Sequence, residues 1–178
     1  RVASKHLLVG FDSGHGELVE LIDLKSRHNH AGKAHERAGL WELEFASGTN
    51  RLSPADAKSF WCQSVAGDRQ ALQLEWKDFE VSGAEGLRVR VLVRLDRAQP
   101  LSRWQISVDG VQDLAIVQAR FPRVLNMPRQ ENEFLAAPVW MGQQAANPRQ
   151  LLAGAQGRGR RYEWAYPGQL SLQCMAFY

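Results

Sequence analysis

The strictest pattern in the sequence lies between Gly86 and Leu95, where apolar and polar side chains alternate. Leu87, Val89, Val91, Val93 and Leu95 fall on one side of this segment, and Arg88, Arg90 and Arg94 fall on the other. Successive side chains of a β-strand point to opposite faces of its sheet, so the alternation predicts a strand with one buried face. The arginines on the other face predict that it is in contact with water.

Further segments, some alternating and some continuously apolar, predict strands along most of the chain. They are His6–Phe11, Glu17–Leu24, Leu40–Phe45, Ser59–Val65, Ala71–Val81, Ser102–Val108 and Leu114–Phe121. The turn residues Asp12–Gly16 predict that the first two form a hairpin, and Asp109-Gly110 predicts another turn. The one helical signal is a single turn at Ser53–Lys58, with Ser53 as its cap and Pro54 at its first position. We therefore predict an all-β fold, an antiparallel β-sandwich in one domain over residues 1–178.

The last stretch, Tyr162–Tyr178, turns at Pro167-Gly168 and then alternates residues that are apolar on nearly both faces. This pattern is typical of a strand in the middle of a fold. We therefore expect the natural polypeptide to continue beyond Tyr178.

Phe121–Gly159 is long, contains several prolines and glycines, and shows no sustained periodicity. We expect an irregular region, and such long loops are usually functional or ordered by a partner surface. Its apolar residues favour the second explanation, with Asn126–Gly159 packed against another domain.

Composition excludes some classes of function. The chain has 178 residues, 44% of them hydrophobic, a formal charge of +3 and a pI near 9.1. The arginines alternate along strands and form no basic block, so nucleic-acid binding is not expected. No apolar run approaches the ~20 residues that span a bilayer, so we expect no membrane partner. Cys62 and Cys174 are far apart in apolar segments; we expect two buried thiols, with a disulfide as the alternative.

Three groups of polar residues are weak candidates for chemistry. His28, His30 and His35 cluster, and the first two would project alike from an extended chain, but a solvated loop is favoured over a metal site. Gly154–Arg161 could hold a phosphate, yet it lacks the Lys-Ser/Thr ending of such loops, and we favour a connection. Glu131 and Glu133 resemble a glycosidase pair in type but not in placement, because they would point the same way. We therefore predict no catalytic residue, no metal and no cofactor in this chain.

Aromatic residues near the irregular region are the candidates for substrate binding. Trp140, Trp164 and Tyr166 could stack on sugar rings, and core packing is the alternative for the two tryptophans. Trp41, Trp76 and Trp104 fit core positions better.

Several sequence segments together resemble the N-terminal β-sandwich module of a group of bacterial glycoside hydrolases. They are Leu21–Lys25, Phe121–Val124, Phe134–Gly142, Asn147-Pro148 and, above all, Tyr166–Tyr178. The chain differs from the pattern of that family at Cys174, where a bulky apolar residue is expected, and over Arg27–Glu36. In that family the module is similar to the galactose-mutarotase-like supersandwich and precedes a catalytic (β/α)-barrel.

The resemblance implies a function for the chain. It would be the non-catalytic N-terminal module of a glycoside hydrolase, supporting the barrel of the same protein and contributing to carbohydrate binding, in a secreted or periplasmic enzyme. The catalytic residues would lie outside these 178 residues. The alternatives are a free-standing carbohydrate-binding domain and a mutarotase-like sugar epimerase, which needs a His and a Glu in one cleft.

Overall fold

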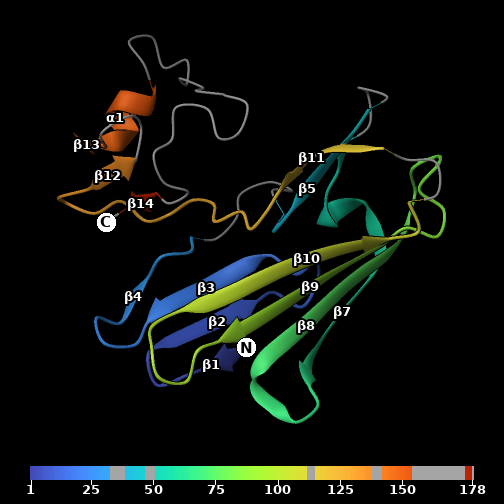
Figure 1. The fold of residues 1–178 in the computed structure, drawn as a ribbon, viewed down its shortest axis with the longest axis horizontal. Coiled ribbons are helices and arrows are strands. Elements are labelled where there is room, and N and C mark those ends of the chain that lie inside the picture. The colour runs from blue at the N-terminus through green and yellow to red at the C-terminus, as the bar shows by residue number, and fades with distance from the viewer. Residues whose placement is uncertain (33–38, 47–50, 112–114, 138–141, 154–174, 178) are drawn as a thin grey trace. The chain divides into compact units, whose positions relative to one another are not determined.

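A computed structural model describes residues 1–32, 39–46, 51–111, 115–137, 142–153 and 175–177 (Figure 1). Its contacts divide the chain into two compact units, Arg1–Pro128 (unit 1) and Arg129–Tyr178 (unit 2). Each unit is described by itself. The single domain expected over residues 1–178 therefore stays a prediction.

The described part of unit 1 contains three antiparallel sheets. Sheet A contains β1 (Val2–Ala3), β2 (Leu7–Phe11), β3 (Leu18–Asp23) and β4 (His28–Asn29), in that order. Sheet B contains β11 (Ile116–Arg120), β5 (Glu42–Phe45) and β6 (Arg51–Leu52). Sheet C contains β10 (Ser102–Asp109), β9 (Arg88–Leu95), β8 (Asp68–Phe79) and β7 (Ala57–Val65), which lie side by side in Figure 1. All strand pairs run antiparallel, as neighbours joined by turns must.

One hydrophobic core joins the three sheets. Sheet A contributes Val2, Val9 and Leu18, sheet B contributes Leu43, Phe45 and Leu52, and sheet C contributes Leu72, Leu74, Trp76, Val89, Val91, Val93 and Leu95. Except for Val2 and Leu52, these residues lie in segments that the sequence predicts to be strands. Trp41 and Trp76 are fully buried and meet edge to face, with ring centroids 5.7 Å apart. The all-β antiparallel fold of sandwich type is thus confirmed.

Local signals of unit 1 are also confirmed. The residues before Leu18 close the β2–β3 hairpin, and η1 (Pro54–Asp56) is the predicted single helical turn. The Asp56 carboxylate accepts hydrogen bonds from the Ser53 N–H and hydroxyl, both at 2.8 Å. Pro54 stands at the first position, where its missing N–H leaves no bond unmade.

Unit 2 corrects the expectation of an irregular region. Its described part contains β12 (Phe134–Ala137), β13 (Gln143–Ala146), β14 (Ala176–Phe177) and the short helix α1 (Pro148–Ala153). The strands form a sheet in the order β13-β12-β14. Short segments rich in alanine and glutamine carry too little alternation of polarity to be recognised, whereas their pairing supplies the backbone hydrogen bonds.

Two further expectations, a last strand in the middle of the fold and a buried Cys62 thiol, are wrong for the residues that the structure describes. Of the last stretch, residues 175–177 are described: they are exposed, and β14 lies at the edge of its sheet, not in the middle of a fold. Cys62 is a free and exposed thiol rather than a buried one, because the edge strand β7 leaves its side chain uncovered. Burial of part of the side chain nevertheless raises the pKa of this thiol.

Candidate functional site

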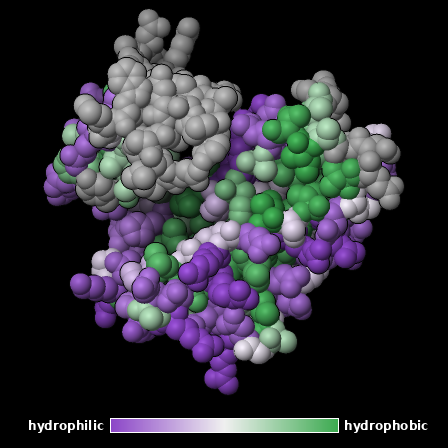
Figure 2. Space-filling view, viewed as in Figure 1, coloured by the Kyte–Doolittle hydropathy of each residue, from purple (hydrophilic) through white to green (hydrophobic). Residues whose placement is uncertain are grey.

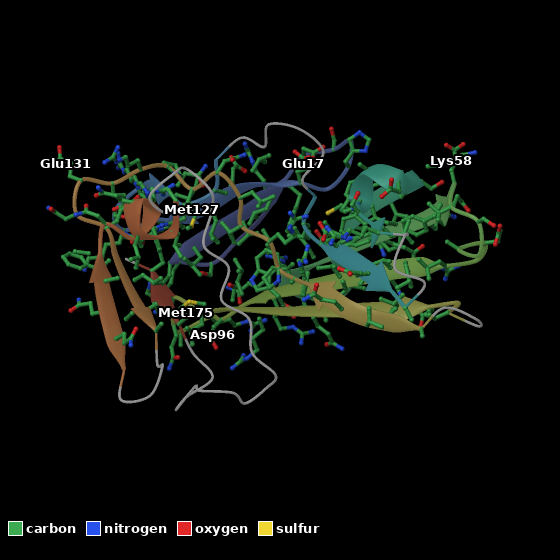
Figure 3. The ribbon with its side chains drawn as sticks, turned by 90° about the horizontal axis from the view of Figure 1, so that it is seen from above. Glu17, Lys58, Asp96, Met127, Glu131 and Met175 are labelled. Atoms are coloured by element: carbon green, nitrogen blue, oxygen red, sulfur yellow. The ribbon has the colours of Figure 1, made fainter. Side chains whose placement is uncertain are left out.

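A pocket of about 510 Å³ in unit 1 is lined by loops and strand ends of several elements. Ionisable side chains line part of it: His15, Glu17, Asp56, Lys58 and Glu80. Small and apolar residues line the rest: Gly39, Pro54, Ala55, Ala57 and Val81. Glu17 and Lys58 lie along the same edge of unit 1 in Figure 3.

The turn between β2 and β3 places His15 and Glu17 at the pocket. Asp12 organises this turn, since its Oδ1 accepts hydrogen bonds from the N–H groups of Gly14 (2.7 Å) and His15 (2.9 Å). Its Oδ2 accepts a third, from the N–H of Glu17. The buried Trp76 adds a long-range tie, because its Nε1 donates to the carbonyl oxygen of His15 at 2.8 Å. The backbone carrying both side chains is therefore anchored to the core.

The carboxyl groups of the pocket differ in their surroundings. Burial, reinforced by the nearby Asp12 charge, raises the pKa of Glu17, and His15 partly offsets this rise. Lys58 Nζ lies 2.6 Å from Glu80 Oε1, and the hydrogen bond to Glu80 raises the pKa of Lys58. Asp56 is bound to Ser53 as described above. Burial thus raises the pKa of the Glu17 carboxyl, whereas Asp56 and Glu80 each have a bonding partner.

The lining determines what the pocket can accept. It offers carboxylate acceptors and the Lys58 and His15 donors together with the ring and methyl groups of Pro54, Ala55 and Ala57. Such a mixture suits a small molecule that carries both hydroxyl and C–H groups. A pyranose ring carries both kinds of group.

The pocket residues were not singled out in the sequence. Their own signals are weak, because His15 and Glu17 stand in a turn, whereas Lys58 and Glu80 lie near strand ends far along the chain. The polar turn Asp12–Gly16 and the Glu that follows it hold two of the ionisable residues, and the predicted helical turn Ser53–Lys58 holds two more, Asp56 and Lys58.

The predicted histidine cluster is present in part. The rings of His28 and His30 meet edge to face at 4.7 Å, as side chains two residues apart on an extended segment should. Burial and the neighbouring His28 lower the pKa of His30, which favours a neutral ring at physiological pH. No group of three or more possible metal ligands occurs in the described part of the chain, and His35 lies outside it.

Glu131 and Glu133 have different environments and do not form a pair. Glu133 is 5% exposed and accepts hydrogen bonds from Arg149 Nε (2.7 Å) and from the N–H of Gln130 (3.0 Å). These bonds, first of all that from Arg149, lower the pKa of Glu133. Glu131 is exposed and points away from the strands of unit 2 in Figure 3. Glu133 therefore holds β12 to the start of α1, which is a structural role.

The remaining predicted site residues cannot be placed. Trp140, Trp164, Tyr166, Gly154–Arg161 and Cys174 lie outside the described residues. Within those residues, no helix is long and apolar enough to cross a membrane. No model of a known protein family matches the chain. No curated protein matches it either.

Proposed function

We propose that this chain is the non-catalytic N-terminal β-sandwich module of a glycoside hydrolase and that it binds carbohydrate. Its partners would be a catalytic (β/α)-barrel of the same protein and the sugar itself. The observation that carries the proposal is the pocket of unit 1, whose lining combines hydrogen-bonding side chains with small apolar ones. The sandwich-type fold agrees with the family resemblance of the sequence.

A binding role accounts for the pocket better than glycosidic cleavage does. Hydrolysis needs two carboxyl groups that face each other across the substrate, one of them free to give up a proton. Here Asp56 is bound by Ser53 and Glu80 by Lys58. This leaves Glu17, the pKa of which burial raises, as the third carboxyl group of the pocket.

Binding can be measured by titrating the 178-residue chain with neutral monosaccharides and disaccharides in a calorimeter. We expect saturable binding of at least one sugar, weakened about tenfold or more by Lys58→Ala because a hydrogen-bonding group is lost. Lys5→Ala, at an exposed lysine outside the pocket, serves as the control. The absence of any sugar binding, or equal affinities for all three proteins, would rule the proposal out.

A second candidate is a mutarotase-like sugar epimerase, which the lining residues of the same pocket support. A general acid and a general base must reach one substrate, and His15 and Glu17 line the same pocket. Burial raises the pKa of Glu17, and a pKa raised by burial is common among catalytic carboxyl groups.

Polarimetry distinguishes the two candidates. If the chain only binds sugar, freshly dissolved aldoses should interconvert their anomers at the uncatalysed rate, and aryl glycosides should remain intact. Acceleration of anomer exchange that is lost in Glu17→Gln would replace the first proposal with the second.

A further inference from the structure

The outer face of sheet C is a second surface with an ordered set of binding groups. One row of residues, each directly opposite the next, runs across all four strands: Gln63, Gln73, Leu92 and Gln105. Gln63 and Gln105 are exposed, and Gln73 is half-buried. Within the described part of the chain, the side-chain amides of these glutamines have no hydrogen-bond partner, so their donors and acceptors are available to a ligand.

The adjoining row contains a fixed aromatic ring. Trp61 stands opposite Glu75 on β8, and its Nε1 donates to Glu75 Oε1 at 3.0 Å. Glu75 is only 7% exposed, and Arg88 Nε lies 3.7 Å from the same oxygen. A carboxylate held in this way fixes the orientation of the indole before any ligand arrives, which lowers the entropy cost of binding.

The charges of this face are largely compensated. Four of its arginines have a carboxylate partner: Arg88 with Glu75, Arg90 with Asp109, Arg94 with Asp68 and Arg103 with Asp96. Lys77, on the same face of β8, has no carboxylate partner among the described residues. A polyanion such as a nucleic acid gains little from cations that are already neutralised. Hydrophilic residues cover much of the region that β8 to β10 occupy (Figure 2).

We propose that this face binds an extended, neutral polysaccharide that lies across β7, β8, β9 and β10. Sugar rings would stack on Trp61, while the amides of Gln63, Gln73 and Gln105 bond to hydroxyl groups along the chain. Strands lie about 4.8 Å apart, so the rows offer roughly 14 Å of contact, enough for several hydrogen bonds in series. The ligand class rests on the proposed function, but the face is separate from the pocket and from its residues.

Native electrophoresis of the whole chain in gels that contain a soluble polysaccharide tests the proposal. Hydroxyethyl cellulose, galactomannan and soluble starch are the neutral probes, and alginate is the anionic one. We expect at least one neutral probe to retard the chain, and Trp61→Ala and Gln73→Ala each to reduce this retardation at least fivefold. Gln99→Ala, at an exposed glutamine in the turn between β9 and β10, is the matched control and should change nothing.

Two further variants of the chain distinguish the remaining explanations. The double variant Gln63→Ala/Gln105→Ala changes only exposed side chains, so it can be tested in place of Trp61→Ala if the Trp61→Ala protein does not fold. Lys58→Ala should keep its retardation, which separates a failure of the face from a failure of the pocket. Retardation by alginate alone, no retardation by any probe, or retardation unchanged in the face variants would overturn the proposal. So would a dimer that Trp61→Ala dissociates, since the face would then bind a second copy.

Discussion

At the scale of single residues, Glu17 shows how the pocket is maintained at a cost in stability. Burial and the Asp12 charge raise its pKa in the folded chain. The folded state therefore prefers the protonated carboxyl, and the charged form is penalised once the pH exceeds the unfolded pKa of about 4.3. The penalty grows as the pH rises from the unfolded pKa to the folded pKa and is constant above the folded pKa.

Glu17→Gln should consequently increase the free energy of unfolding at pH 7 and leave it unchanged near pH 4. Urea unfolding at both pH values measures this difference. Glu131→Gln, at an exposed site in unit 2, is the control and should stay within about 0.5 kcal/mol of the parent at both values. A loss of stability in Glu17→Gln at pH 7 would mean that the carboxylate makes a stabilising contact.

The two central tryptophans provide a second comparison of residues. Both are fully buried, but Trp76 Nε1 donates to the His15 carbonyl at 2.8 Å, whereas Trp41 Nε1 has no partner among the described residues. Replacement by phenylalanine removes a similar volume at each site. Trp76→Phe should therefore cost about 1 kcal/mol or more beyond Trp41→Phe, because it also removes a hydrogen bond.

Urea unfolding of both variants, followed by circular dichroism, measures this difference. Equal costs, or a larger cost for Trp41→Phe, would show that packing shape outweighs the bond. The comparison also bears on the pocket, because the bond from Trp76 anchors the backbone of His15.

At the scale of elements, the turn that carries His15 and Glu17 depends on Gly16. Its φ is +72°, and an added Cβ would lie 2.6 Å from the rings of Phe60 and Trp76. Gly67, in the turn between β7 and β8, has a similar φ of +77° but open space around it. The two glycines thus share the backbone requirement and differ in the crowding.

Gly16→Ala should cost about 1–3 kcal/mol more than Gly67→Ala, because overpacking is added to the strain of a left-handed backbone. Thermal unfolding of both variants measures the difference, and sugar titration should show weaker binding for Gly16→Ala alone. If both variants unfold at the same temperature, the rings of Phe60 and Trp76 move aside at no cost, and the turn is not held by close packing.

The sequence predicted elements well where a strand has one buried face. Strand β9 follows the alternation of Leu87–Leu95, because a core on one side and water on the other impose period two. Strands β12 and β13 were missed, because four residues give too few alternations. The pocket was missed for another reason: tertiary packing assembles it from His15, Lys58 and Glu80, and no local pattern connects these residues.

At the scale of the whole molecule, the core of unit 1 is complete in itself. Every member of its buried cluster lies between Val2 and Leu95, and the partly buried residues that pack on it end at Val124. The strands from β1 to β11 pair only with one another in the described structure. Burial of one contiguous core is the main driving force for folding, so these residues contain what a sandwich needs.

We therefore expect residues 1–128 alone to fold. The shortened chain should unfold cooperatively in urea and keep the near-ultraviolet circular dichroism that its packed tryptophans produce. It should also keep the sugar affinity of the pocket, whose residues all belong to unit 1. The full chain, measured in parallel, is the control. An unfolded or aggregated 1–128 would instead support one domain over residues 1–178, because residues of unit 2 would then be needed to complete the cooperative fold.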